Sequence, residues 1–344
     1  MYPKNFGRLM YLKKFGRLMY PKKFFWKMFN VPLTFSYGCS KIVPSDRGKK
    51  LPPIKLKRRM KKMNEKKLDR RRKYYMVLDC ETATLPTAAN YSGEARKRIA
   101  IAKPLIYDLG WTVIDAQGRI YRRRSYLISE IFSVPAIFNT AHYAVKRPLY
   151  LEKLQRGEIS IKTWKEATEI LERDLSEVAA VGAYNSMFDF KKAIPFTELY
   201  INQLYSPSFY DWEEMQNKIC ADIANNIRRE SNKTFEPETF SFRFKTYPLF
   251  DLWGLSATHI LNCDDFRDKA LDNNWISASG KYYSTTAETT FKYVTNNHDF
   301  EESHTAIEDA EIESEIFRLI CEKTKRKFEM GIIYFPFRIV GRIE

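Results

Sequence analysis

A short hydrophobic segment that ends in two carboxylates constrains this chain more than any other stretch. Residues 74–78 are β-forming or apolar and run directly into Asp79, Cys80 and Glu81. Because side chains alternate along a strand, we expect Asp79 and Glu81 on one face and Cys80 on the other, packed in the core. Taken alone, the pair also fits a surface strand. On a buried strand, two neighbouring carboxylates repel each other and lose hydration, and a bound cation is the usual compensation. Oxygen ligands of this kind favour Mg²⁺ or Mn²⁺.

Two later stretches place further carboxylates and a histidine next to apolar segments. Asn185-Ser-Met-Phe-Asp189 follows the apolar run 178–181 and opens a helical segment. Far downstream, His304-Thr-Ala-Ile-Glu-Asp309 begins a strongly helical segment. We therefore predict that acids from three distant stretches converge on one site.

The order Asp-x-Glu, Asn-x-x-Phe-Asp and His-x-Ala-x-x-Asp resembles the three exonuclease motifs of the DEDDh family. This family includes proofreading exonuclease subunits, ribonuclease T and oligoribonuclease. The resemblance extends over roughly residues 74–322. It implies an α/β, ribonuclease-H-like fold, in which a mixed central β-sheet is flanked by helices. It also implies a metal-dependent 3′→5′ exonuclease that releases nucleoside monophosphates from single-stranded or frayed 3′ ends, with DNA favoured. The implied cofactors are two Mg²⁺ (or Mn²⁺) ions.

The same resemblance implies a role for each motif residue. Asp79 would bridge the two ions, Glu81 and Asp309 would complete the ion that holds the attacking water, and Asp189 would bind the second ion. His304 would be the general base, a task that suits its reference pKa of about 6.5.

Four further residues are candidates for substrate contacts. Thr82 and Leu85 follow the first motif, where the family uses backbone amides and an apolar wedge against the terminal nucleotide. Leu85 is the candidate wedge. Asn185 and Phe188 are expected to orient the turn that presents Asp189.

The helix that follows His304 is expected to bring Asp309 to the sheet. Ala306 is small, which would let this helix approach the sheet closely. The remaining acids of its first turns are interpreted as a solvated face, as charge runs usually are: Glu308, Glu311, Glu313 and Glu315.

The resemblance implies one exonuclease domain over residues 74–344 with an insertion at about 197–300. Its expected order is βββ-α-β-α. The expected elements are strands at 74–79, 105–114, 119–128 and 178–184, and helices at 162–177 and 187–201. Within the insertion we expect a helix at 211–229, a one-sided strand at 239–245 and a hairpin at 280–283. Residues 332–340 are expected to be an edge strand or a packed tail.

Residues 1–73 form a basic extension that we expect to be disordered. They contain 24 Lys and Arg against three acids, a net charge of +21, whereas the rest of the chain is at −5. A nine-residue repeat starts at Met1, Met10 and Met19. Three explanations remain open: an extension without function, a nucleic-acid-binding arm, and an organelle transit peptide.

The cysteines and the apolar runs exclude other classes. Five cysteines without a C-x-x-C pair indicate neither a zinc module nor a disulfide framework, so a reducing cytoplasm is the expected location. No run approaches the about 18 apolar residues of a membrane span, and we expect no membrane partner.

Two alternatives to a DNA exonuclease remain. One is an exoribonuclease of the ribonuclease T or oligoribonuclease type. The other is a non-catalytic nucleic-acid-binding protein, against which the presence of all five motif residues argues. The chain resembles phage-like members of the family, and a role in DNA repair or replication would follow. The sequence does not indicate an oligomeric state.

Overall fold

The computed structural model describes residues 68–69, 71–85, 103–205 and 234–343. All of these residues belong to one unit, Met60–Glu344. The predictions for the basic extension and for the helix at 211–229 lie outside the described residues.

Seven strands form one mixed sheet in the order β4-β3-β2-β1-β5-β7-β6. Their bounds are β1 Tyr74–Ala83, β2 Leu105–Asp115, β3 Ile120–Ile128, β4 Ser160–Lys162, β5 Ala180–Ala183, β6 Thr239–Phe242 and β7 Lys245–Asp251. β2 is antiparallel to β1 and β3, whereas β5 is parallel to β1 and β7 is parallel to β5. The central order β3-β2-β1-β5-β7 with β2 reversed is a ribonuclease-H-like topology, so the predicted fold class is confirmed.

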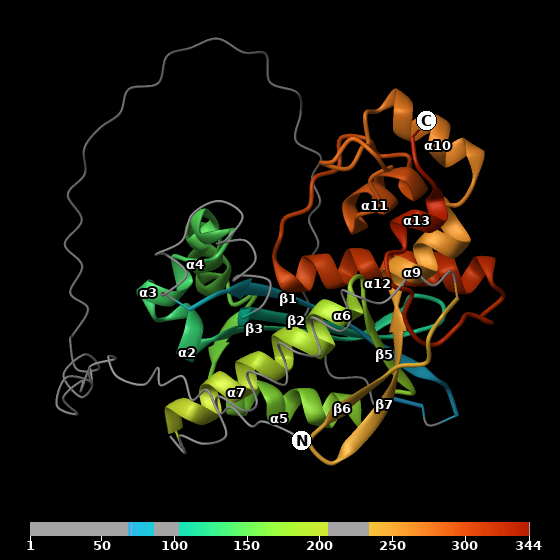
Figure 1. Cartoon of the computed structure of the whole chain (residues 1–344). Helices are drawn as coiled ribbons and strands as arrows, with labels where there is room; N and C mark the ends of the chain where they lie inside the picture. Colours follow the sequence, from blue (N-terminus) through green and yellow to red (C-terminus); the bar gives the residue numbers. More distant parts are fainter. Residues whose placement is uncertain (1–67, 70, 86–102, 206–233, 344) are drawn as a thin grey trace, which may run out of the picture. The chain divides into compact units, whose positions relative to one another are not determined.

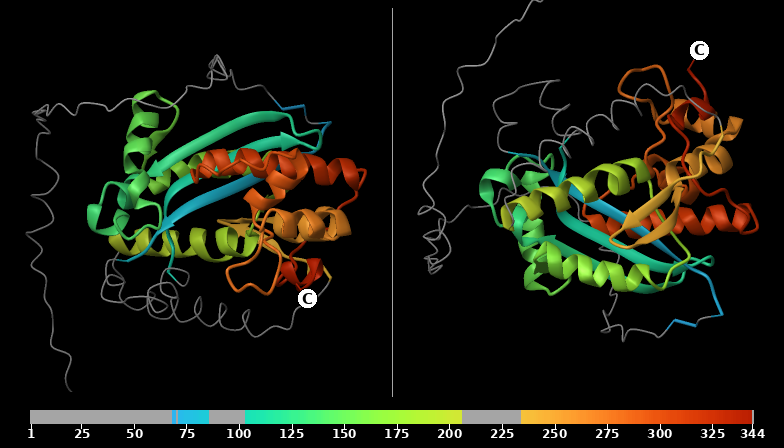
Figure 2. Two further views of the ribbon diagram at one scale, coloured as in Figure 1. Left: turned by 90° about the horizontal axis from the view of Figure 1, so that it is seen from above. Right: turned by 60° about the horizontal axis from the view of Figure 1, so that its bottom comes forward.

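Helices cover both faces of this sheet. Figure 1 shows α12 against one face of β1 and β2, with α5 and α7 on the opposite face, and the two views in Figure 2 agree. The helix bounds are α2 Ser129–Phe132, α3 Pro135–Phe138, α4 Arg147–Gln155, α5 Trp164–Leu175, α6 Ser186–Phe188, α7 Ile194–Tyr205, α9 Leu252–Ser256, α10 Asp264–Asp272, α11 Ala287–Thr295, α12 Ala306–Lys323 and α13 Phe337–Val340. Because both faces are covered, β2 is buried along its whole length.

Local sequence signals explain where α5 begins and which face it buries. Thr163 and Glu166 form a reciprocal capping box, in which each side chain accepts a hydrogen bond from the other residue's backbone N–H. Trp164, Leu171 and Leu175 recur at helical spacing and are buried in the core under the sheet.

Pro195 predicts an interruption of the helix at 187–201 near that residue, but the structure places the interruption earlier, at Asp189–Ala193. A π-helical turn, η3 Asp189–Ala193, separates α6 from α7. Pro195 is the second residue of α7, where the missing N–H group of proline is tolerated.

Backbone contact between α12 and β2 brings that helix close to the sheet. Gly110 of β2 faces the first turn of α12, where a Cβ atom would lie only 2.4 Å from the carbonyl carbon of Ala306. Asp108 of β2 accepts a hydrogen bond from the Ala306 N–H at 3.0 Å. Farther along, the hydroxyls of Thr112 and Ser314 are 2.6 Å apart. The small residue at the start of α12 therefore packs on a glycine of the sheet.

Several elements differ from the prediction. β4 and the helices α2 and α3 between β3 and α5 were not predicted, because segments of three or four residues are too short to show a repeating hydrophobic pattern. The nine-residue α4 was also not predicted, because its buried residues, Tyr150 and Lys153, form no apolar stripe. The stretch 239–245 is a hairpin rather than one strand: Phe240 and Phe242 are buried in the core, and Phe244 is fully exposed at the turn. The end of the chain is a packed tail with the helix α13, not an edge strand.

Replacing Gly110 by Ala should reduce the free energy of unfolding by about 3 kcal/mol, at the upper end for overpacked sites. The new Cβ would meet backbone atoms that cannot rotate away. Denaturant unfolding measures the loss. Gly157→Ala is the matched control, because nothing lies within 4 Å of its Cβ and only its left-handed backbone (φ +67°) is strained, at about 1 kcal/mol. Equal losses in the two variants would contradict the close approach of α12.

Candidate active site

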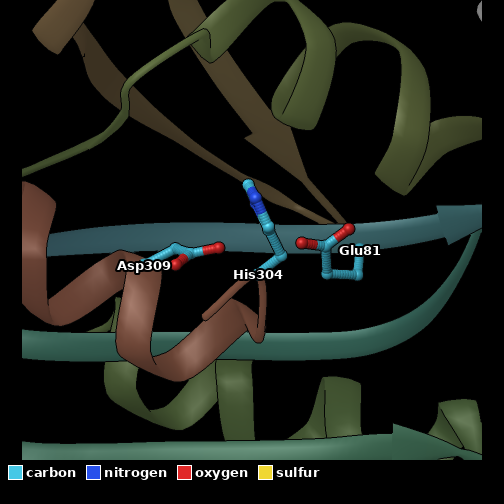
Figure 3. A group of neighbouring side chains, drawn as sticks. All are labelled: Glu81, His304 and Asp309. Carbon is cyan, nitrogen blue, oxygen red and sulfur yellow. The ribbon is translucent and has the colours of Figure 1, made fainter. Parts of the chain in front are cut away.

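Three of the predicted residues meet at the end of β1. Ligand atoms of Glu81, His304 and Asp309 all lie within 4.8 Å of one another. Figure 3 shows that Glu81 projects from β1 and Asp309 from α12, with His304 between them in the segment that precedes α12. The strand pairing of β1 shifts register directly after Glu81, which ends the regular ladder at this point.

Asp79 of β1 lies beside this group and is half-buried. Burial raises the pKa of Asp79 well above its usual value, and the negative charges of Glu313, Asp189 and Asp309 raise it further. Burial also raises the pKa of Asp309 to about 8. These carboxylates interact strongly with one another in surroundings that disfavour their charge.

Asp189 is the first residue of η3, and it is held by a partner that the sequence did not reveal. The Cys80 thiol donates a hydrogen bond to Asp189 Oδ1 at 2.9 Å. Cys80 lies in the hydrophobic core, as predicted, but its role is not packing alone. Burial raises the pKa of Asp189 to about 7, and the hydrogen bond from Cys80 opposes that rise.

The turn that presents Asp189 is fixed by the end of β7. Asp251 accepts hydrogen bonds from the backbone N–H groups of Ser186 at 3.0 Å and Gly254 at 2.8 Å. The backbone carbonyl of Asn185 accepts a hydrogen bond from the Phe188 N–H at 2.7 Å. Asp251 was missed by the sequence analysis, although a buried strand that ends in an acid repeats the pattern at Asp79.

The two candidate contacts after the first motif, Thr82 and Leu85, are both half-buried. Thr82 is half-buried and follows the register shift of β1. Leu85 is half-buried against the hydrophobic core. The intervening Thr84 is fixed by its N–H, which donates to the Thr140 hydroxyl at 2.8 Å.

His304 is held in an unusual backbone conformation. Its φ of +49° is in the left-handed region, which is strained for a residue other than glycine. The Tyr150 hydroxyl donates to the His304 carbonyl at 3.4 Å, and Lys146 Nζ donates to the Ser303 carbonyl at 2.7 Å. These contacts from α4 and the preceding turn constrain the segment on both sides of the strained residue.

The His304 ring has neighbours that the sequence did not predict. The Tyr143 ring stacks on it with centroids 4.2 Å apart and planes 12° apart. Glu288 and Glu302 form a second acidic group with the ring, and a Glu302 oxygen is 3.7 Å from Nδ1. Burial lowers the pKa of His304, and the positive charge of Lys146 lowers it further. No sequence signal indicated Tyr143, because it belongs to no motif.

The interpretation of the acids of α12 as a solvated face is wrong for Glu313. Glu313 is buried, and its carboxylate accepts a hydrogen bond from the Tyr184 N–H at 3.1 Å. It is four residues after Asp309 and therefore on the same face of the helix, a spacing that could have predicted its burial. The other three acids form ion pairs. Glu308 pairs with Lys153 at 2.6 Å, Glu311 pairs with Arg123 at 2.8 Å, and Glu315 pairs with Arg318 at 2.7 Å.

The residues present suit a divalent cation. Asp309 Oδ1 is buried and has no hydrogen-bond partner among the described residues. An orphaned carboxylate oxygen beside other carboxylates is an all-oxygen donor set, which Mg²⁺ and Mn²⁺ prefer. Among the described residues, Glu81 and Asp309 lie with His304 in a group whose atoms are close enough to hold such an ion.

No protein-family model matches the chain, and a search of curated proteins finds no match. Among solved structures, the chain is similar to the crystal structure of cell-death related nuclease 4, with a TM-score of 0.34 and 10% sequence identity. The similarity covers 72% of this chain and 64% of that chain, which is less than two thirds of the nuclease. In the described part of the chain, no helix is long and apolar enough to cross a membrane.

The metal-free protein should lose thermal stability as the pH rises from about 5 to about 8. In the unfolded chain a carboxyl group has a pKa near 4. Folding raises the pKa of Asp189 to about 7 and that of Asp309 to about 8. Between about pH 5 and about pH 8 the folded chain therefore binds more protons than the unfolded chain. The free energy of unfolding falls as pH rises through this range. Thermal melts in a chelator at matched ionic strength measure the slope.

Mg²⁺ or Mn²⁺ should raise the melting temperature more at pH 8 than at pH 5, because the ions neutralise charges that protons neutralise at low pH. Asp309→Asn should flatten the pH slope in chelator and reduce the effect of the metal. Stability that increases with pH in the metal-free wild type would be evidence against the buried carboxylate cluster.

Proposed function

We propose that this protein is a metal-dependent 3′→5′ exonuclease of the DEDDh type. It hydrolyses phosphodiester bonds at single-stranded or frayed 3′ ends of nucleic acid, with DNA favoured, and releases nucleoside monophosphates. The observation that supports this most directly is the meeting of Glu81, His304 and Asp309, from two ends of the described chain, beside the half-buried Asp79 and the buried Asp189.

In this proposal the acids would hold two Mg²⁺ or Mn²⁺ ions. Asp79 lies among the other carboxylates and is assigned to both ions, Glu81 and Asp309 to one of them, and Asp189 to the other. When bound, such a pair supplies positive charge to the phosphate and lowers the pKa of a bound water. The protein contributes the fixed positions of the donors, set by β1, η3 and α12.

His304 is assigned the role of general base. A lowered pKa keeps the imidazole neutral near pH 7, so that a ring nitrogen can accept a proton from water. The stacked Tyr143 ring and the constrained backbone limit the directions in which His304 can point. Positioning of this kind favours proton transfer from one defined direction.

Substitution of the metal-binding acids should abolish degradation. Loss of a metal that supplies several kcal/mol to the transition state corresponds to about 10³-fold in rate. We expect this for Asp79→Asn and Asp309→Asn on 5′-labelled oligonucleotides with Mg²⁺ or Mn²⁺, while the exposed Asp272→Asn remains at the wild-type rate. Single-stranded DNA, single-stranded RNA and duplexes are compared in parallel.

The products distinguish this function from others. A ladder that shortens from the 3′ end, with nucleoside monophosphates as products, is expected. Internal cleavage, shortening from the 5′ end or undiminished activity of Asp309→Asn would contradict the assignment. A preference for RNA over DNA would move the protein to the exoribonuclease alternative.

His304→Ala should reduce the turnover number by about 10² to 10⁴-fold, as expected for loss of a general base. The metal-induced rise in melting temperature should persist, because His304 is not assigned as a ligand. His298→Ala is the matched control, since His298 is an exposed histidine that contacts only Asn273, Asn296 and the Trp275 ring among the described residues. A loss of metal-induced stabilisation in His304→Ala would instead place the imidazole among the ligands.

A further inference from the structure

A cavity of about 590 Å³ lies directly beside the candidate active site. It is bounded by the end of β5, the start of α9, the segment 276–287 and α13. Figure 1 shows α9 and α13 close to α12. Two walls of the cavity continue into the site. Asn185 belongs to the turn that presents Asp189, and Ala287 directly precedes Glu288, whose carboxylate lies against His304.

Aromatic rings and hydroxyls line this cavity. The Trp253 and Phe337 rings face each other with centroids 6.1 Å apart, and Tyr282 packs edge-on to Phe337 at 4.8 Å. The Trp253 ring is fixed by its Nε1, which donates to the Thr285 hydroxyl at 2.8 Å. The volume of the cavity is within the range of about 300–1,000 Å³ that is typical of ligand sites, and such sites are usually lined by rings with a few convergent polar groups.

Positive charge surrounds the same rings. The Arg342 guanidinium lies 5.5 Å from the Tyr282 ring centroid and donates to the Tyr282 hydroxyl at 3.0 Å. The Arg338 guanidinium lies 5.9 Å from the Phe337 ring. Both arginines are exposed, and neither forms an ion pair with another described residue. Aromatic rings interleaved with free cations suit bases that stack and phosphates that need a counter-charge.

We propose that this cavity, the aromatic-basic pocket, binds a base of the single strand whose 3′ end occupies the active site. The proposal rests on the proposed function and assigns a role to the part of the predicted insertion between Trp253 and Ala287. A strand is favoured over a free small molecule by electrostatics. The acids around Asp79 repel a polyanion, so a strand held there gains affinity from cations beyond the reacting phosphate. Arg338 and Arg342 supply such cations.

Binding of single-stranded DNA to the full-length protein tests the pocket without turnover. Oligonucleotides of 12 nucleotides, each with one 2-aminopurine at a successive position from the 3′ end, are titrated in chelator. Stacking on the rings should quench fluorescence at one internal position and not at the others. Tyr282→Ala should remove that quenching and weaken affinity about 5- to 150-fold, as for loss of one stacked base.

Arg342→Gln provides a second test that leaves the rings in place. It should lower the slope of log affinity against log salt by about 0.7, the value for one phosphate contact on a single strand. Phe244→Ala and Lys245→Gln are matched controls, because both side chains are exposed at the β6–β7 turn and line no part of the pocket. Neither control should change quenching, affinity or the salt slope.

Kinetics separate the pocket from the chemistry. With saturating substrate, Tyr282→Ala and Arg342→Gln should keep the wild-type kcat. Their KM should be raised on the 12-mer. On a dinucleotide, which is too short to reach the pocket, their KM should equal that of the wild type. Failure of the proposed function would appear as no degradation by wild type, with position-specific quenching intact. Equal quenching and equal affinity in wild type and both variants would overturn the pocket. Affinity for a mononucleotide equal to that for the 12-mer would also overturn its assignment to a strand.

Discussion

Mutual repulsion among buried carboxylates is the constraint on which the rest of this structure depends. Asp79, Glu81, Asp309 and Glu313 gather where β1 passes under α12, and burial raises the pKa of each. Such a cluster opposes folding unless protons or cations neutralise it. The surrounding fold therefore has to hold like charges together.

Backbone contacts hold the helix against the sheet here. The absence of a side chain at Gly110 lets the first turn of α12 reach β2. The Asp108 carboxylate fixes that turn by accepting a hydrogen bond from the Ala306 N–H. Cys80 and Asp251 do the same for η3 from two other strands. The acids are thus positioned by Asp108, Asp251 and Gly110, which lie outside the three motifs, and by Cys80, the variable residue of the first motif.

The hydrophobic pattern predicted the longer strands and helices of the central sheet, in which the pattern repeats several times. The acids stood out because they lie directly beside apolar runs. It could not predict partners that only tertiary packing brings together, such as Cys80 with Asp189 or Tyr143 with His304. The burial of Glu313 could have been predicted in part. Its spacing from Asp309 places it on the same helix face, but the charged residues around it suggested a solvent-exposed position. The aromatic-basic pocket has residues separated by more than 80 positions along the chain, with no repeating pattern.

The order in which these elements leave the ribosome differs from the order in which they can be buried. β1 is completed at Ala83, but the helix that covers one of its faces begins only at Ala306. At about 5–20 residues per second, tens of seconds separate the two. During that interval the hydrophobic side of the central strand, with Tyr75 and Val77 that later pack against α12, lacks its cover. A nascent chain of this protein therefore has a long period in which an aggregation-prone strand must be shielded by something other than its native partner.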